Sequence, residues 1–205
     1  MASSRLSADT SGLAVQPAAI VLVGGRSSRM GTDKASLLLD GVSMQDRVLA
    51  AVAGAGITNV IVAGTEQAPD AVAGDDQVGS QGPLAGIVGA WNTLRLRTEP
   101  PTDPIVVLAC DLPWLVASVI RQLMADSRRH SHGAVAHDGD RAQPLVAAYR
   151  PVALDAMASS FDTGERSVRR CSAGWDLGVV NADPGVIADV DKPSDLAGFA
   201  VEWPS

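Results

Sequence analysis

The sequence predicts an α/β fold in which helices cover both faces of a mostly parallel sheet. Three observations lead to this prediction. Short apolar runs of strand length recur along the chain, segments with helical spacing of apolar residues separate them, and glycine-rich or charged stretches follow several runs. Alternating strands and helices are typical of three-layer α/β proteins, which bind ligands beyond the carboxyl ends of their strands.

The elements of the first half of the chain follow from these patterns. The continuous apolar runs at 18–23 and 59–64 are typical of strands that are buried on both faces. The segment 44–56 has apolar residues at helical spacing and ends at Gly56, which predicts a helix. A second helix is predicted at 83–97, because this segment begins with proline and ends with arginines.

The second half of the chain continues the alternation. A third buried strand is predicted at 104–111, where an apolar run ends in a carboxylate. The same criteria predict helices at 116–129, 151–161, 165–174 and 193–199, and strands at 133–137, 144–150 and 185–191.

Composition excludes several classes of protein. The 205-residue chain has a formal net charge of −7, which disfavours a nucleic-acid partner, and it has no apolar stretch near twenty residues, which disfavours a membrane. Cys110 and Cys171 lack metal-site spacing, and the N-terminal segment lacks the apolar centre of a signal peptide, so we expect a cytoplasmic protein. We expect residues 1–17 to form a flexible tail and residues 18–205 to form one domain.

The first predicted strand runs into the loop "LVGGRSSRMGTDK", from Leu22 to Lys34. Adjacent glycines and basic residues are the parts of a phosphate-binding loop, because glycines let N–H groups approach phosphate oxygens and cations neutralise the charge. The spacing matches neither the P-loop nor the G-x-G-x-x-G dinucleotide motif. From the residues alone, the alternative is a solvated surface loop without a ligand.

The stretch "GGRSSRMGTDK" resembles the G-G-x-S-x-R-M-G-x-D-K signature of nucleotidyltransferases that make sugar nucleotides and cofactor dinucleotides. Among these, the chain is most similar to the MobA-like molybdenum cofactor guanylyltransferases. Later stretches resemble further family motifs in the same order, over roughly residues 18 to 200: "GPLAGI", "ACDLP", "QPLVAAYR", "GERSVRR" and "DVDKPSDL". Two departures are Val23, where the family usually has alanine, and Asp189 with Asp191, where MobA-like chains often have asparagines.

The resemblance implies a three-layer, Rossmann-like nucleotidyltransferase fold with a mixed, mostly parallel sheet. It also implies transfer of GMP from GTP to the phosphate of molybdopterin or molybdenum cofactor, with release of pyrophosphate. The attacking phosphate oxygen is largely ionised at neutral pH, since its second pKa is near about 6, so no general base is required. Alternatives are a cytidylyltransferase acting on the same pterin, a sugar-phosphate nucleotidyltransferase, and a binding protein without turnover.

The resemblance also implies roles for individual residues. Arg29 and Lys34 are the expected catalytic residues, which hold the triphosphate. The expected nucleotide-binding residues are Leu22, Val23, Gly24, Gly25, Arg29, Lys34, Asp75, Gly82 and Asp111. Among these, Asp75 would accept hydrogen bonds from the guanine N1–H and N2 amine, with Asp76 as the alternative.

Mg²⁺ or Mn²⁺ is the expected cofactor, because two anionic substrates must be held together. The expected metal ligands are Asp111, for which the alternative is a helix cap, and Asp191, for which the alternative is that it or Asp189 caps the helix near Pro193. The expected partners are GTP, a molybdopterin-type phosphate acceptor, and transient contacts with enzymes that make or receive the cofactor.

Overall fold

The computed structural model describes residues 17–23, 37–64, 82–97, 101, 104–196 and 201–202. Its centre is a six-stranded sheet with the strand order β4-β1-β5-β7-β6-β8. The strands are β1 (Ala18–Leu22), β4 (Asn59–Ala63), β5 (Ile105–Ala109), β6 (Gly133–His137), β7 (Ala142–Tyr149) and β8 (Leu177–Asn181). All but residue 17 of the predicted N-terminal tail lies outside the described residues.

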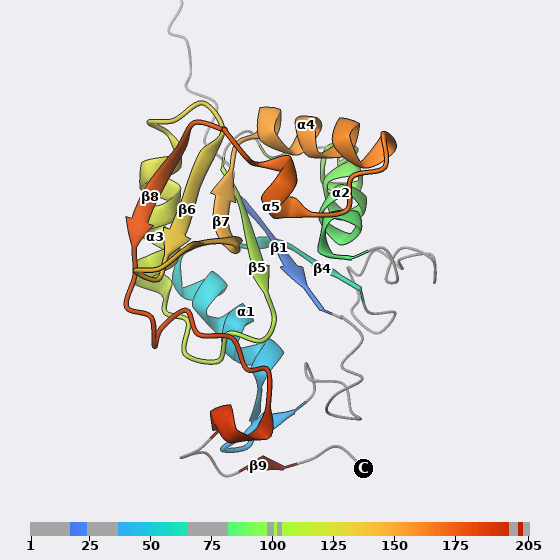
Figure 1. Ribbon diagram of the computed structural model, residues 1–205. Helices are drawn as coiled ribbons and strands as arrows, with labels where there is room; N and C mark the ends of the chain where they lie inside the picture. The colour runs from blue at the N-terminus through green and yellow to red at the C-terminus, as the bar shows by residue number, and fades with distance from the viewer. Residues whose placement is uncertain are drawn as a thin grey trace, which may run out of the picture.

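The direction of the strands confirms the predicted mixed, mostly parallel sheet. β1 pairs in parallel with β4 and with β5, and β6 pairs in parallel with β8. β7 is antiparallel to both of its neighbours, β5 and β6, and its arrow points opposite to theirs in Figure 1. The other five strands of this sheet therefore run in one direction and end at one edge.

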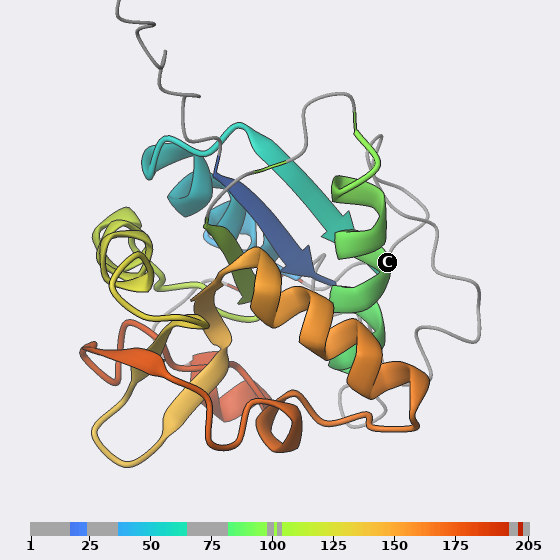
Figure 2. The same cartoon turned by 90° about the horizontal axis from the view of Figure 1, so that it is seen from above.

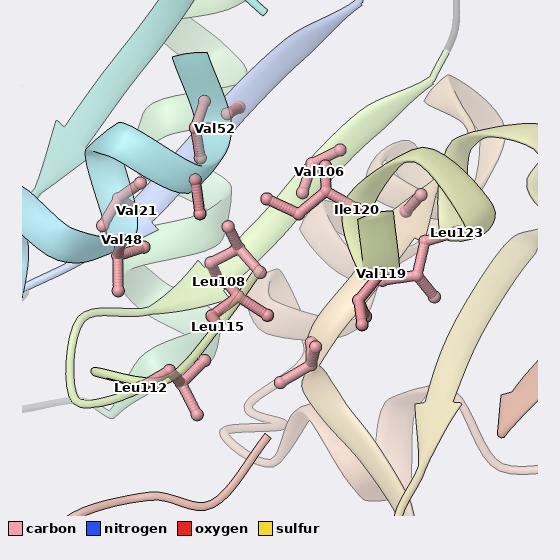
Figure 3. Close-up of a cluster of buried hydrophobic side chains, with 14 of the residues drawn as sticks. Val21, Val48, Val52, Val106, Leu108, Leu112, Leu115, Val119, Ile120 and Leu123 are labelled. Carbon is pink, nitrogen blue, oxygen red and sulfur yellow. The ribbon is translucent and has the colours of Figure 1, made fainter. Parts of the chain in front are cut away.

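Helices cover both faces of this sheet and make three layers (Figure 2). α1 (Met44–Gly54) and α3 (Ala117–Ser127) lie on one face, and α2 (Pro83–Leu94), α4 (Pro151–Asp162) and the short α5 (Val168–Cys171) lie on the other. Each face has its own apolar cluster. Figure 3 shows the first cluster, in which Val48 and Val52 of α1 and Ile120 of α3 pack with residues of β1 and β5.

A second, three-stranded sheet with the order β3-β2-β9 was not predicted. Its strands are β2 (Leu38–Leu39), β3 (Val42–Ser43) and β9 (Val201–Glu202). Asp40 and Gly41 join β2 to β3 with φ angles of 52° and 76°, and positive φ at both central residues is typical of a two-residue hairpin. The Asp-Gly pair between apolar residues was therefore the signal for this hairpin.

The predicted strand at 185–191 is wrong. These residues form a turn and an irregular segment, and β8 at the edge of the sheet begins eight residues earlier, at Leu177. The reason is that the apolar side chains of residues 185–191 pack in different hydrophobic clusters. Ile187 packs with the α1 and α3 cluster, whereas Val190 packs with Leu37, Leu39 and Met44 beside the small sheet.

Two predicted helices are shorter than expected. Of the predicted helix 165–174, only α5 forms, because Glu165 accepts hydrogen bonds from the Arg166 and Ser167 N–H groups before the helix begins. The predicted helix at 193–199 is a 3-10 turn, η2 (Pro193–Leu196), and residues 197–199 lie outside the described residues. None of the helices in the described part of the chain has the length and apolarity that crossing a bilayer requires.

β7 carries an irregularity that shapes the carboxyl edge of the sheet. Val135 of β6 pairs with Ala147, but the next residue, Ala136, pairs with Gln143, so residues 144–146 fall outside the regular register. A proline in a strand is tolerated at such a bulge, because the bulge needs no N–H there. The buried Tyr149 hydroxyl donates a 2.9 Å hydrogen bond to the Pro144 carbonyl oxygen and closes the bulge, and burial raises the pKa of Tyr149.

We expect Tyr149→Phe to lower the free energy of unfolding by about 1 kcal/mol, because the Pro144 carbonyl loses its donor while the ring is kept. Urea unfolding measures the change. Ser159→Ala is the matched control, because it removes a hydroxyl bond from the exposed surface of α4 and should cost less. Equal stability of Tyr149→Phe and the wild type would mean that this bond does not support the bulge.

Candidate functional site

Several segments that follow strands begin at the carboxyl edge of the central sheet. The segments after β1, β4 and β5 leave the sheet there, because these strands are parallel neighbours. The β6–β7 hairpin and the segment after β8 lie at the same edge, at the lower side of Figure 1. The placement agrees with the prediction for the described part of these segments, Val23 after β1 and residues 110–113 after β5, whereas residues 24–34 and 75–81 lie outside the described residues.

The described residues include only part of the predicted site. They include Leu22, Val23, Gly82, Asp111 and Asp191. The predicted residues Gly24, Gly25, Arg29, Lys34 and Asp75, with the alternative Asp76, lie outside the described residues.

The main chain of Leu22 and Val23 is fixed between two strands. The Cys110 N–H donates to the Leu22 carbonyl oxygen at 3.0 Å, and the Val23 N–H donates to the Ala63 carbonyl oxygen at 2.8 Å. Both side chains are buried, and that of Val23 belongs to the α1 and α3 cluster. Residues 22 and 23 therefore start the glycine loop from a rigid point, and their side chains are part of the core.

Gly82 caps the N-terminus of α2 in a conformation that favours glycine, with a φ of 86°. A Cβ atom at this position would lie 3.6 Å from the Arg166 carbonyl oxygen, an ordinary contact distance, so the preference for glycine comes from the φ angle. One turn later, a Cβ at Gly86 would lie 3.1 Å from Leu22 Cδ2, so the helix packs closely on the end of β1.

One main-chain hydrogen bond joins the segments that carry Asp111 and Asp191. The Val190 N–H donates to the Asp111 carbonyl oxygen at 3.0 Å, which places residues 189–191 against the segment that follows β5. Asp111 is half-buried and Asp191 is exposed. The predicted meeting of these segments is thus found, although it is made by an irregular segment and not by a strand end.

The helix-cap alternatives can be compared with the hydrogen bonds around η2 and α3. Asp195 accepts from the N–H groups of Asp191 and Lys192 at 3.0 and 2.9 Å, which lowers the pKa of the Asp195 carboxyl. This carboxylate therefore organises the start of η2. α3 begins at Ala117 with Val116 at its N-cap, so Asp111 does not cap it.

A cavity of about 280 Å³ lies beside Asp111 at the carboxyl edge. Apolar residues at the ends of β5 and β7 and in the segment after β8 form part of its wall. The polar residues that line it are Asp111, Arg141, Gln143, Arg169 and Asp189. Arg141, Gln143 and Arg169 were not predicted from the sequence, and Asp189 was predicted only as a possible helix cap. The signal for Arg141 and Gln143 was their place in a short connection between two predicted strands.

The charges around the cavity fall into two pairs. Carboxylates such as Asp111 and Asp189 are the groups that bind a hard divalent cation, and guanidinium groups such as Arg141 and Arg169 bind phosphate. Arg169 also donates a 3.1 Å hydrogen bond to the Ala142 carbonyl oxygen and so ties α5 to the start of β7. The cavity therefore suits an anionic ligand next to a cation.

The segment that carries Arg169 is held by Glu165. Its carboxylate accepts from Arg170 and from the N–H groups of Arg166 and Ser167, and these bonds lower the pKa of Glu165 to about 2. Glu165 is therefore ionised at neutral pH, and it fixes the start of α5.

In the part of the chain that the structure describes, no group of three or more acidic, histidine or cysteine residues is arranged to hold a metal ion. Mg²⁺ commonly uses one or two carboxylates together with substrate phosphates. Asp111 with one neighbouring aspartate fits that donor set.

Residues 19–176 match the family model of the MobA-like NTP transferase domain. The chain belongs to this family. It is therefore a nucleotidyltransferase, and MobA-like enzymes of this kind are generally dependent on divalent metal ions. The cavity residues Ile187 and Asp189 lie beyond the matched range, so the family model does not include the whole site.

The chain is also similar to individual proteins over most of its length. It is 29% identical to the molybdenum cofactor guanylyltransferase of Shewanella sp. strain MR-4, covering 93% of this chain and 98% of that protein. It is 31% identical to the enzyme of the same name from Shewanella baltica strain OS185, covering 90% and 95% of the two chains. The crystal structure of molybdopterin-guanine dinucleotide biosynthesis protein A from Archaeoglobus fulgidus has the same fold, with a TM-score of 0.64, 20% identity, and coverage of 87% and 94%.

Proposed function

We propose that this MobA-like enzyme transfers GMP from GTP to the phosphate of molybdopterin or molybdenum cofactor and releases pyrophosphate. The observation that carries the proposal is the similarity, over nearly the whole chain, to relatives named molybdenum cofactor guanylyltransferase. The cavity at the carboxyl edge supports it, because arginines and carboxylates stand side by side where two phosphate-bearing substrates must meet.

In this reaction an oxygen of the acceptor phosphate attacks the α-phosphorus of GTP. A new P–O bond forms, the bond between the α-phosphorus and the bridging oxygen breaks, and pyrophosphate leaves with the electron pair. Arg141 and Arg169 would bind the acceptor phosphate in the cavity, and Arg29 and Lys34 of the glycine loop would hold the triphosphate. Main-chain N–H groups of Gly24 and Gly25 and the α2 terminus at Gly82 would add donors for the phosphates.

Asp111 and Asp191 would hold a Mg²⁺ or Mn²⁺ ion. Asp111 lines the cavity, and the hydrogen bond from the Val190 N–H to its carbonyl oxygen brings the main chain next to Asp191 close to it, which supports this assignment. A bound divalent ion neutralises phosphate oxygens and so lowers the repulsion between the two anionic substrates. Asp189, which lines the cavity together with Asp111, is the alternative second ligand.

The function is tested by turnover with each of the four ribonucleoside triphosphates, using molybdopterin and a panel of sugar phosphates as acceptors. We expect GTP and molybdopterin to be the preferred pair. Asp75→Asn should lower kcat/KM for GTP more than for CTP, because the amide cannot accept both guanine hydrogen bonds, and Asp76→Asn is the matched control. Preference for CTP or for a sugar phosphate would support the alternative transferases, and no turnover with any pair would reject the proposal.

Lys34→Ala should lower kcat/KM by about 100-fold or more, because a cation that contacts the triphosphate stabilises the charge that develops on pyrophosphate. Steady-state kinetics measure the loss, and circular dichroism checks the fold. Arg26→Ala is the matched control, since it removes one positive charge from the same loop and should cost much less. Equal losses in the two variants would mean that total loop charge matters and not the position of Lys34.

Asp191→Ala should raise the Mg²⁺ concentration for half-maximal turnover by at least about tenfold, because a carboxylate ligand is lost. A Mg²⁺ titration and a melting curve on the same preparation measure the two effects. Asp189→Ala is the comparison variant, because this neighbouring aspartate lines the cavity. A Mg²⁺ curve that shifts in Asp189→Ala and not in Asp191→Ala would give the second ligand position to Asp189. The metal assignment is wrong if Asp191→Ala loses about 1 kcal/mol of stability with an unshifted Mg²⁺ curve, as a helix-cap variant would.

A further inference from the structure

The β6–β7 hairpin is organised by the side chain of Asp138. One carboxylate oxygen, Oδ1, accepts hydrogen bonds from the N–H groups of Asp140 and Arg141 at 2.9 and 2.8 Å. The other, Oδ2, accepts from the Gln143 side-chain amide and lies 3.8 Å from Arg141 Nε. The Asp138 side chain is only 18% exposed and is not among the residues that line the cavity.

Two of the groups that Asp138 holds do line the cavity. Arg141 and Gln143 contribute polar side chains to its wall, from the turn and from the first residues of β7. The Arg141 side chain is 61% exposed, so without a nearby anion little else would restrain its long stem. The carboxylate of Asp138 therefore decides how these two side chains are presented to a ligand.

The hairpin also has supports that do not depend on the Asp138 side chain. The Asp138 N–H donates to the Arg141 carbonyl oxygen at 3.2 Å, and Gly139 takes up the positive φ of 100° that the turn requires. Arg169 holds the Ala142 carbonyl oxygen from the other side. Loss of the carboxylate charge would therefore loosen two side chains without unfolding the hairpin.

We propose that Asp138 is a positioning residue that fixes Arg141 and Gln143 at the wall of the cavity for binding of the phosphate-bearing acceptor. This inference rests on the proposed function, because it assigns the cavity to the acceptor. The two bonds from main-chain N–H groups lower the pKa of Asp138 to about 2, so the carboxylate keeps its charge throughout the neutral range. Asp138 does not itself meet the substrates. It orders the Arg141 and Gln143 side chains before the ligand binds, so these side chains lose less conformational entropy on binding.

Asp138→Asn is the main test variant. The amide oxygen can still accept from the Asp140 and Arg141 N–H groups, but the amide nitrogen cannot accept from Gln143 and carries no charge for Arg141. We expect KM for the acceptor to rise by about tenfold, with kcat and KM for GTP changed by less than about twofold. Asp140→Asn, which removes an exposed carboxylate from the same turn, is the control for net charge and should change none of these values.

A double-mutant cycle separates positioning from a general loss of structure. If Asp138 acts through Arg141 and Gln143, adding Asp138→Asn to the double variant Arg141→Ala/Gln143→Ala should not raise the acceptor KM further. The inference is overturned if the folded Asp138→Asn variant keeps the wild-type KM for the acceptor, or if its effect adds in full to that of the double variant.

A second measurement keeps the inference separate from the proposed function. NMR relaxation of the Arg141 Nε–H and Gln143 Nε2–H groups reports their order in the free protein, and both should become more mobile in Asp138→Asn but not in Asp140→Asn. If the wild type turns over none of the acceptors, the proposed function fails, and this measurement still tests the positioning. Equal order in the wild type and Asp138→Asn would overturn the inference whatever the reaction is.

Discussion

The hydrogen bond from the Val190 N–H to the Asp111 carbonyl oxygen holds two distant parts of the chain at the centre of the site. On one side of this bond is the end of β5, a buried strand that lies between β1 and β7 in the central sheet. On the other side is a segment without regular structure, which is kept in place because the Val190 side chain is fully buried with Leu37, Leu39 and Met44. The bond and this packing together hold the main chain of residues 189–191 next to Asp111.

The reversed direction of β7 supplies another part of the cavity wall. A parallel strand would begin at the opposite edge of the sheet, whereas β7 begins at the carboxyl edge, so its first residues can serve as a wall. The close approach of β6 and β7 is made possible by Gly133, where a Cβ would lie 2.2 Å from the Ala148 carbonyl oxygen. Residues 144–146 of the bulge and Ala109 at the end of β5 both line the cavity.

Most of the sheet could be predicted from the sequence because buried parallel strands appear as unbroken apolar runs, as in "AAIVLV" and "PIVVLACD". β8 was missed because it is an edge strand in which Val179 is 55% exposed, so its pattern is weak. The false strand at 185–191 had the apolar residues of a strand, but these contact two different clusters, and no local pattern distinguishes the two cases.

The site also contains residues that a local sequence pattern reveals and residues that only the tertiary structure reveals. Asp111 could be predicted because it directly follows a strand, whereas Arg141, Gln143 and Arg169 are recognisable only when the strand order places their segments beside it. The residues predicted from the glycine loop, among them Arg29 and Lys34, lie outside the described residues and stay predictions.

The late position of Asp189 in the chain has a consequence for limited proteolysis. All six strands of the central sheet end by residue 181, and residues 187–191 follow them. These late residues form part of the cavity wall and lie against the segment of Asp111. Cleavage between residues 182 and 186 would therefore leave every strand of the sheet on one fragment and separate Ile187 and Asp189 from the rest of the wall.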